Sequence, residues 1–331
     1  MRQTDAIDET ARRAGDVLDR VSEAVVGKRD ELRLVLAGIL AGGHVLFEDV
    51  PGLGKTLAAR SFAQALGLSF RRLQFTPDLL PADVTGAVVY DQRQGTFEFR
   101  RGPVFTNLLL ADEINRTPPR TQAALLEAMQ EHQVSVEGAT HRLEQPFVVL
   151  ATANPIEYEG TYQLPEAQLD RFMLRVSFGY LTPELEWEVL ARRVGRRQED
   201  TRVDAVVDAA GLRGMQSAVE TVDVEASVGR YIVDLVTATR RRPEVLVGAS
   251  PRGALACMLC ARAWAVIDGR DFVTPDDVKA VAGAALGHRL TLRPETYIRR
   301  VDSADIVRSV LAEVPVPATA GRPAYELGGE P

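Results

Sequence analysis

A glycine-rich turn between an apolar strand and a helix carries residue types that bind phosphate. The segment 44–67 reads HVLFEDVPGLGKTLAARSFAQALG and supplies the strand, the turn and the helix in that order. Gly52 and Gly54 permit tight backbone turns, so amide N–H groups can converge on phosphate oxygens at the helix N-terminus. Lys55 is placed to reach the β- and γ-phosphates of a nucleotide, and the Thr56 hydroxyl is placed to coordinate Mg²⁺.

The turn departs from the full phosphate-loop pattern at one position. The pattern G-x-x-x-x-G-K-[ST] begins with glycine, whereas Asp49 stands at that place in this chain. The alternative is a chance G-K-T on a structural turn, which the flanking strand and helix disfavour. We expect the loop as a whole to bind ATP, which adds Pro51, Leu53 and Leu57 to the residues named above.

An acidic pair and an amide follow two further apolar strands. The segment TNLLLADEIN (106–115) ends its apolar run at Asp112 and Glu113, and PFVVLATANP (146–155) ends at Asn154. Asp112 is expected to hold Mg²⁺ through water, and Glu113 to polarise the attacking water as a general base. Ligands bind at the carboxyl ends of strands in open α/β sheets, which places Asn154 beside the γ-phosphate or that water. Singly, these residues are ordinary strand caps and turns; together with the loop, they predict an ATP-hydrolysing site.

The elements that must position these groups follow from the hydropathy pattern. Two amphipathic helices are predicted at 5–22 and 29–41, and the second ends at a Gly-Gly pair. Five short apolar runs follow, mostly separated by helical segments, which predicts a parallel sheet covered on both faces and an α/β fold. Two stretches, 87–99 and 133–146, alternate around a glycine turn and are predicted β-hairpins. The five apolar runs are 44–50, 70–75, 107–112, 147–152 and 172–178.

The pattern changes after Thr182-Pro183, which suits the start of a helix. Helical periodicity then continues to about residue 312. An α/β domain at 1–181 is therefore expected to precede an all-α domain at 182–312. Residues 313–331 are rich in Pro, Gly and Ala and are predicted to form a flexible tail.

Composition restricts the class of protein. The 331 residues carry a formal net charge of −7 and give a pI near 5.3, which argues against a surface devoted to gripping nucleic acid. The N-terminus lacks an apolar signal region and no apolar run is long enough to cross a bilayer, so a cytoplasmic protein without membrane insertion is expected. Cys257 and Cys260 form a lone C-x-x-C in an apolar stretch, and buried, reduced thiols are expected there rather than a zinc site.

Longer motifs resemble those of AAA+ ATPases, and more closely those of the MoxR family. The resemblance spans roughly residues 22–290 and is more specific than a bare G-K-T. Asp49 resembles the usual form of the loop in this family. The matching segments are EDVPGLGKT (48–56), QFTPDLLPADVTG (74–86), GPVFTNLLLADEINRTPPRTQAALLEAMQE (102–131), ATANPIEYEGTYQLPEAQLDRF (151–172) and GASPRG (248–253).

The resemblance implies an α/β ATPase core followed by a small helical lid, with the nucleotide clamped between them. It also implies an insert in helix 2, here 87–99, and a hairpin before the sensor-1 strand, here 133–146. Asn154 matches sensor 1. Arg171 matches the arginine finger, which acts on the neighbouring subunit's nucleotide, and Arg252 matches the sensor-2 arginine, which reaches the γ-phosphate from the lid. The residues that match the adenine-lining loop are Val25, Val26 and Gly27.

The same resemblance implies a homo-oligomeric ring, most commonly a hexamer, in which ATP hydrolysis drives remodelling, maturation or assembly of a client protein. The typical partner is a separate protein with a von Willebrand factor A domain, and no DNA is expected. Two alternatives are an ATPase subunit of a metal-chelatase-like complex and, less favoured, a nucleic-acid motor. The acidic pI and the single positive charge in the turn 91–95 disfavour the motor. For Arg171, the alternative is an ordinary ion pair with Glu166 or Asp170.

Overall fold

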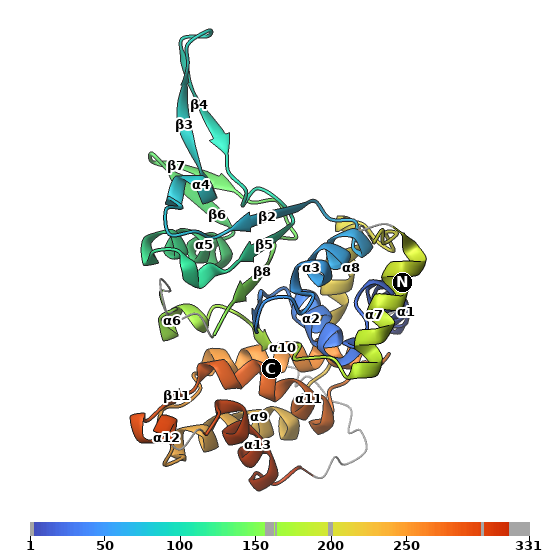
Figure 1. The fold of residues 1–331 in the computed structure, drawn as a ribbon. Helices are drawn as coiled ribbons and strands as arrows, with labels where there is room; N and C mark the ends of the chain where they lie inside the picture. Colours follow the sequence, from blue (N-terminus) through green and yellow to red (C-terminus); the bar gives the residue numbers. More distant parts are fainter. Residues whose placement is uncertain (1–2, 156–161, 163, 198–200, 299–300, 318–331) are drawn as a thin grey trace, which may run out of the picture.

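A five-stranded parallel sheet organises the first half of the computed structural model, with strand order β2-β5-β8-β1-β9 (Figure 1). The structure describes residues 3–155, 162, 164–197, 201–298 and 301–317. The predicted parallel sheet is confirmed, because each of the five apolar runs supplies one strand. The strands are β1 (Val45–Glu48), β2 (Phe70–Gln74), β5 (Leu108–Asp112), β8 (Val148–Ala153) and β9 (Leu174–Val176).

Both faces of this sheet are covered, because successive side chains of a strand point to opposite faces. Phe47 and Leu108 belong to one hydrophobic cluster, whereas their neighbours Leu46 and Leu109 belong to another. The first cluster includes α1 (Gln3–Ala24), α2 (Arg29–Leu40) and α3 (Lys55–Ala65), and the second includes α5 (Pro119–Glu131). The strands run parallel, so the polar residues at their carboxyl ends meet along one edge of the sheet.

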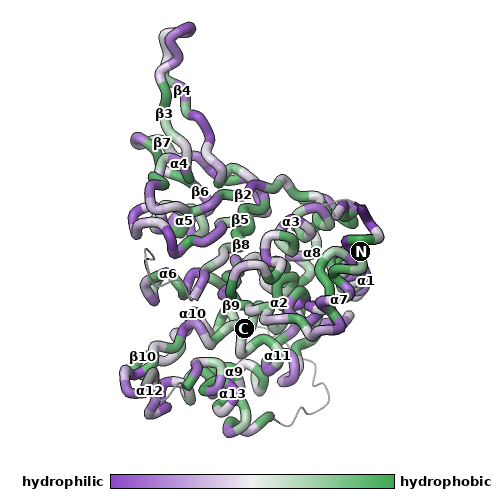
Figure 2. Tube along the Cα trace, in the orientation of Figure 1, coloured by the Kyte–Doolittle hydropathy of each residue, from purple (hydrophilic) through white to green (hydrophobic). Residues whose placement is uncertain are grey.

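Both predicted hairpins are present. The short helix α4 (Pro81–Thr85) leads into β3 (Gly86–Asp91) and β4 (Thr96–Arg101), which project away from the sheet (Figure 1). The second hairpin consists of β6 (Gln133–Val136) and β7 (Ala139–Arg142). The Phe99 ring stacks on His141 with 3.9 Å between ring centroids, which joins the two hairpins near their bases. The outer turn of the longer hairpin is hydrophilic (Figure 2).

The second half of the chain is helical, as predicted, with one small addition. A two-stranded antiparallel ribbon joins β10 (Val245–Val247) to β11 (Thr291–Leu292). The short helical segments are η1 (Ile114–Arg116), after β5, α6 (Glu166–Leu169), between β8 and β9, and η2 (Gly287–Arg289), in the second half. The helices are α7 (Pro183–Arg196), α8 (Ala209–Glu220), α9 (Ala226–Arg241), α10 (Pro251–Ile267), α11 (Pro275–Leu286), α12 (Pro294–Ile298) and α13 (Ser303–Glu313). Residues 318–331 of the predicted tail lie outside the described residues.

The lid packs directly on the N-terminal helices of the core. Helix α10 contacts α1, α2 and α8, and residues of all these helices share one hydrophobic cluster with the sheet. Cys257 and Cys260 lie in this cluster, buried and free, which confirms the expected core thiols. Burial raises the pKa of Cys257 to about 12. Among the described residues, no helix combines the length and apolar character that a bilayer crossing requires.

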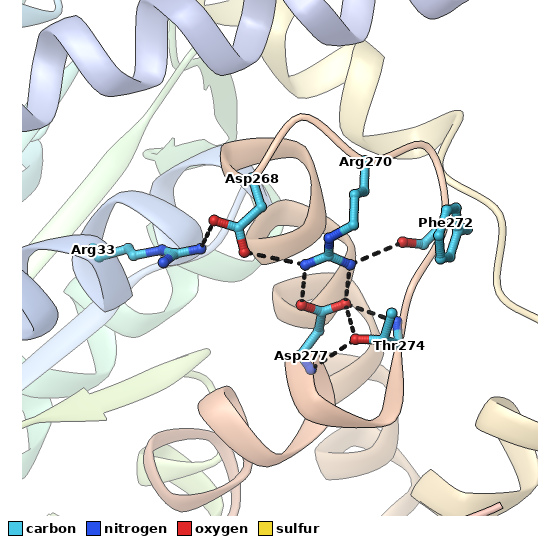
Figure 3. A network of polar contacts seen from close by, with 6 residues as sticks. All are labelled: Arg33, Asp268, Arg270, Phe272, Thr274 and Asp277. Atoms are coloured by element: carbon cyan, nitrogen blue, oxygen red, sulfur yellow. Dashed lines mark hydrogen bonds and ion pairs between the residues drawn. The ribbon is translucent and has the colours of Figure 1, made fainter. Parts of the chain in front are cut away.

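A polar network fixes the end of α10 to α2 (Figure 3). The Arg33 guanidinium lies 3.8 Å from the Trp264 ring centroid and forms an ion pair with Asp268. Arg270 contacts the same Asp268 and donates two hydrogen bonds, of 2.5 and 2.6 Å, to the carboxylate of Asp277. Asp277 is 2% exposed and in turn caps the start of α11. The first turn of α11 is thereby tied through α10 to the core.

Candidate active site

The phosphate loop joins β1 to α3 at the carboxyl edge of the sheet. Gly52 and Gly54 have φ values of 86° and 87°, in the left-handed region that favours glycine. Gly54 is the N-cap of α3, so the free amides of the first helical turn point toward the loop. Lys55 Nζ donates to the carbonyl oxygens of Asp49, at 2.6 Å, and Val50, at 3.0 Å. Burial lowers the pKa of Lys55, while the nearby carboxylates of Asp49, Asp112 and Glu113 oppose that shift.

Asp49, the departure from the glycine pattern, has a structural function. Its Oδ2 accepts hydrogen bonds from the backbone N–H of Phe178, at 2.6 Å, and of Gly179, at 2.8 Å. The Ser177 hydroxyl donates to the same oxygen at 3.1 Å. Asp49 is 9% exposed, so these bonds are largely shielded from water. The side chain therefore anchors the start of the phosphate loop to the segment after β9.

Asp112 lies at the end of β5 with both carboxylate oxygens hydrogen-bonded. The Thr152 hydroxyl donates to Oδ1 at 2.7 Å, and Arg72 Nε donates to Oδ2 at 2.9 Å. Asp112 is 8% exposed. Thr152 comes from β8, beside β5 in the sheet, and Arg72 comes from β2 on the other side. The carboxylate is therefore held between its two neighbouring strands.

Glu113 follows in a left-handed conformation, with φ 57° and ψ 50°. Such a conformation is costly for a non-glycine residue and is common at functional sites. Its N–H donates to the Thr152 hydroxyl at 2.8 Å. Its Oε2 accepts a hydrogen bond from Gln74 Nε2, at 2.5 Å, and an ion pair from Arg116, at 3.1 Å. The Glu113 carboxylate is therefore held by one side-chain amide and one guanidinium group.

These groups line one cavity of about 400 Å³. The predicted residues from the loop, from the acidic pair and from the β8 end are thus brought together. Asn154 is 6% exposed and lines the cavity, while its carbonyl accepts a hydrogen bond from Asn115 at 3.0 Å. The lining residues are Pro51, Gly52, Gly54, Lys55, Thr56, Leu57, Arg72, Asp112, Glu113, Thr152, Ala153 and Asn154.

A neighbouring cavity of about 530 Å³ lies between the phosphate loop and α7. Val25, Val26 and Leu53 line it, as does the inner side of α7. Gly27 is not among the lining residues; it lies against α7, where a Cβ would be 2.6 Å from Leu185 Cδ1. The apolar walls and the position beside the loop suit an adenine base.

Arg171 and Arg252 lie elsewhere. Both line a third cavity, of about 250 Å³, together with His44. His44 directly precedes β1, and the phosphate loop directly follows β1. About 16 Å of extended strand therefore separates His44 from the loop. Arg252 lies near the start of β1 because it stands in the first turn of α10, and α10 packs on α2. Neither arginine lines the phosphate cavity of its own chain.

Asp170, one of the two carboxylates considered for Arg171, pairs with a different arginine. Asp170 Oδ1 accepts from Arg289 Nε at 2.7 Å, and the Arg289 side chain is 2% exposed. His44, which also lines this arginine cavity, is 5% exposed. The backbone N–H of Val149 donates to its Nδ1 at 3.0 Å, so Nε2 carries the proton and donates to the Met129 carbonyl, also at 3.0 Å.

Four polar residues that line these first two cavities, or contact their lining residues, were not identified from the sequence. Arg72 and Gln74 end the second apolar run, at i and i+2 on one side of β2, and their place at a carboxyl strand end was the available signal. Thr152 carried the same signal. Lys28 is 7% exposed and donates to the carbonyls of Phe178 and Tyr180, so a second of the three lysines supports the site.

The donor set fits Mg²⁺. The Thr56 hydroxyl and the Asp112 carboxylate are hard oxygen donors in the same cavity, and Mg²⁺ is commonly held by one or two protein oxygens, substrate phosphates and water. Among the described residues, no group of three or more His, Cys, Asp or Glu side chains forms a metal-binding cluster.

Comparisons with known proteins agree with this geometry. Residues 44–174 match the ATPase family associated with various cellular activities (AAA), and residues 237–310 match an AAA lid domain. The chain is 46% identical to the protein YeaC of Bacillus subtilis, over 92% of this chain and 94% of that one. It is 40% identical to the chaperone MoxR1 of Mycobacterium tuberculosis, over 90% of this chain and 80% of that one.

A solved structure extends the agreement to the whole fold. The structure of a proposed ATPase from Cytophaga hutchinsonii has a TM-score of 0.88 and 40% sequence identity, over 95% of this chain and 98% of that one. The relatives span nearly the full chain and include a protein named as a MoxR chaperone. This chain therefore belongs to the MoxR family of AAA+ ATPases.

Proposed function

We propose that this ATPase hydrolyses Mg·ATP in the phosphate cavity and uses the energy to remodel a partner protein. The observation that carries the proposal is the convergence of Lys55, Thr56, Asp112, Glu113 and Asn154 on one cavity beside an apolar cavity of suitable size for adenine. Phosphoryl transfer to water needs positioning and positive charge rather than covalent chemistry, and this set of groups supplies both.

Each side chain has a distinct task in the proposed reaction. Lys55 exchanges the carbonyls of Asp49 and Val50 for phosphate oxygens, and the α3 amides bind the same oxygens. Glu113 accepts a proton from the attacking water, while Asn154 orients that water or the γ-phosphate. Mg²⁺, held by Thr56 and through water by Asp112, adds positive charge at the phosphates. We place the boundary between core and lid at 181/182, with α7 contributing to the adenine cavity.

Arg171 and Arg252 are proposed to act on the nucleotide of a neighbouring subunit. Support comes from their shared cavity, which lies at the other end of β1 from their own phosphate loop. This moves Arg252 from the expected role at its own γ-phosphate to a role in trans. An arginine supplied from outside adds on the order of 10³–10⁵ to the rate of known phosphoryl transfers. Such a site is complete only in an oligomer, and a hexameric ring is the form we propose.

Mixed oligomers test this arrangement. Glu113→Gln subunits keep both arginines, whereas Arg171→Ala or Arg252→Ala subunits keep the base. Each variant alone should hydrolyse ATP at no more than a few percent of the wild-type rate, and mixing Glu113→Gln with either arginine variant should restore phosphate release. The matched control is the double variant Glu113→Gln/Arg171→Ala, which should restore nothing to Arg171→Ala. Absence of recovery with Arg252→Ala at every mixing ratio would mean that Arg252 acts on the nucleotide of its own subunit.

The projecting β3–β4 hairpin is proposed to contact the client or a von Willebrand factor A partner. Tyr90 and Phe97 form a cross-strand pair with ring centroids 5.1 Å apart, and they are 51% and 74% exposed. Aromatic side chains are enriched in protein interfaces. The relative named as a chaperone supports a protein client, which would be met in the cytoplasm, where ATP is supplied. Cross-linking from position 92, in the turn of the hairpin, in a Glu113→Gln trap should capture a protein chain, and the same trap carrying Phe97→Ala should capture less.

A nucleic-acid motor predicts a different result. It would show ATPase activity that rises with added DNA and loses that rise steeply with salt. We expect no stimulation, because the hairpin turn carries one positive and one negative charge, Arg93 and Asp91. A metal-chelatase subunit would instead turn over ATP only with a chelating partner present.

A further inference from the structure

Arg72 is the one basic side chain besides Lys55 among the residues that line the phosphate cavity. It stands on β2, the edge strand of the sheet, and reaches across to the neighbouring strand β5. Its Nε lies 2.9 Å and its terminal nitrogen 2.7 Å from Asp112 Oδ2. The Arg72 side chain is 51% exposed, whereas that of Asp112 is 11% exposed. A half-exposed cation therefore contacts a nearly buried anion.

The two oxygens of Asp112 are both in use. Oδ1 is fixed by the Thr152 hydroxyl, a hydrogen bond from within the sheet, so Oδ2 is the oxygen that turns toward Arg72. A water molecule of the Mg²⁺ shell would need a carboxylate oxygen as its acceptor. Two guanidinium N–H groups already occupy Oδ2, and a divalent cation beside a guanidinium adds like-charge repulsion. Arg72 and the Mg²⁺ shell therefore compete for Oδ2 of Asp112.

We propose that Arg72 is a competing counter-ion for the magnesium site. It neutralises Asp112 while no metal is bound, and it gives up this contact when Mg²⁺ arrives with the nucleotide. The proposal rests on the proposed function, because it assigns the metal to Asp112. Arg72 is thus a positioning residue that keeps the nearly buried carboxylate paired between turnovers. Its terminal nitrogen also donates to Gln74 Oε1 at 3.0 Å, so the half-exposed side chain keeps a partner on β2 when it leaves Asp112.

The consequence is measurable as thermodynamic coupling between Mg²⁺ and nucleotide. Wild-type protein gains affinity for ADP when Mg²⁺ is present, but part of that gain is lost in displacing Arg72. The ratio of the ADP dissociation constant in EDTA to that in Mg²⁺ measures the gain. Any contact between Arg72 and the nucleotide that persists in both conditions cancels in this ratio. ADP is used because it carries no γ-phosphate and is not hydrolysed.

Arg72→Gln should increase this ratio about three- to fivefold, the upper range for an ion pair with one exposed partner. The matched control is Arg71→Gln, which removes an arginine from the adjacent position on the opposite side of β2 and should leave the ratio unchanged. Arg72→Lys retains the charge without the forked geometry and should fall between the two. Asp112→Asn should bring the ratio close to one.

An unchanged or smaller ratio in Arg72→Gln, with folding verified by its melting temperature, would overturn the inference. A smaller ratio would mean that Arg72 assists the metal instead of competing with it. Failure of the proposed function gives a separate result: wild-type protein would bind ADP no better than Lys55→Ala, in either buffer. A protein that binds ADP normally but shows no effect of Arg72 refutes the counter-ion role alone.

Discussion

Replacing Asp49 by glycine would complete the phosphate-loop pattern, yet the structure predicts that it damages the protein. The substitution removes the acceptor of the backbone N–H groups of Phe178 and Gly179, which lie 2.6 and 2.8 Å from Oδ2. Phe178 is 2% exposed, so its N–H would have no ready access to water. Asp49→Gly would match the sequence pattern more closely, but we expect it to be less stable than the wild-type protein.

The magnitude follows from the number of donors left unpaired. A buried donor without a partner costs about 1–3 kcal/mol, and bonds to a charged acceptor lie at the upper end of that range. Gly179 is partly exposed, so water recovers some of its loss. Glycine adds about 0.5–1 kcal/mol of backbone entropy. We expect Asp49→Gly to lower the free energy of unfolding by about 3–5 kcal/mol, a large share of the 5–15 kcal/mol typical of domains.

Urea unfolding, together with ADP titration, measures both effects. The loop loses its anchor to the segment after β9, so ADP affinity should fall at least tenfold at temperatures where the variant remains folded. Ser177→Ala is the matched control, because it removes one donor and leaves the carboxylate with its backbone partners; it should cost less than about 1 kcal/mol. Wild-type stability and affinity in Asp49→Gly would refute the anchoring role and favour the simple pattern.

Three further predictions concern His44, which lines the arginine cavity, the contact of Arg33 with the lid, and the two buried thiols. Burial lowers the pKa of His44 from its usual 6.5 to about 4, so the unfolded chain takes up a proton first as the pH falls. His44 should therefore cost about 3 kcal/mol of stability between pH 6.5 and 4, visible as a flatter pH dependence of urea unfolding in His44→Gln; parallel curves for the two proteins would contradict this. Arg33→Ala should lower the unfolding free energy by about 1–2 kcal/mol, because it loses the ion pair with Asp268 and the contact with Trp264. The control Arg29→Ala removes an exposed pair with Asp19 and should change the unfolding free energy by less than about 0.5 kcal/mol. Equal effects of the two substitutions would contradict a special role of Arg33. Because the pKa of Cys257 is raised to about 12 and both thiols are buried, a chromogenic disulfide reagent at pH 8 should react only at the rate of unfolding, and rapid labelling of native protein would disprove their burial.

The local sequence determined the elements and most of the phosphate cavity. Alternating or continuous apolar runs specify strands, and the backbone geometry of the loop from Gly52 to Thr56 depends on a few consecutive residues. The ends of parallel strands must meet at one edge of a sheet, so Asp112, Glu113 and Asn154 could be placed beside the loop without coordinates. Their chemistry depends on residue type and on strand order, both of which the sequence pattern carries.

The tertiary structure decided which groups pair and which end of the sheet the lid arginine reaches. Arg72, Gln74 and Thr152 contact the acidic pair only because β2 and β8 flank β5 in space, while about forty residues separate them along the chain. Asp49 likewise finds its partners in the segment after β9. Arg252 lies beside the start of β1 because α10 packs on α2, a contact between distant helices that no local pattern encodes. Local propensity and periodicity fix the elements, but packing between distant elements selects the partners of each side chain.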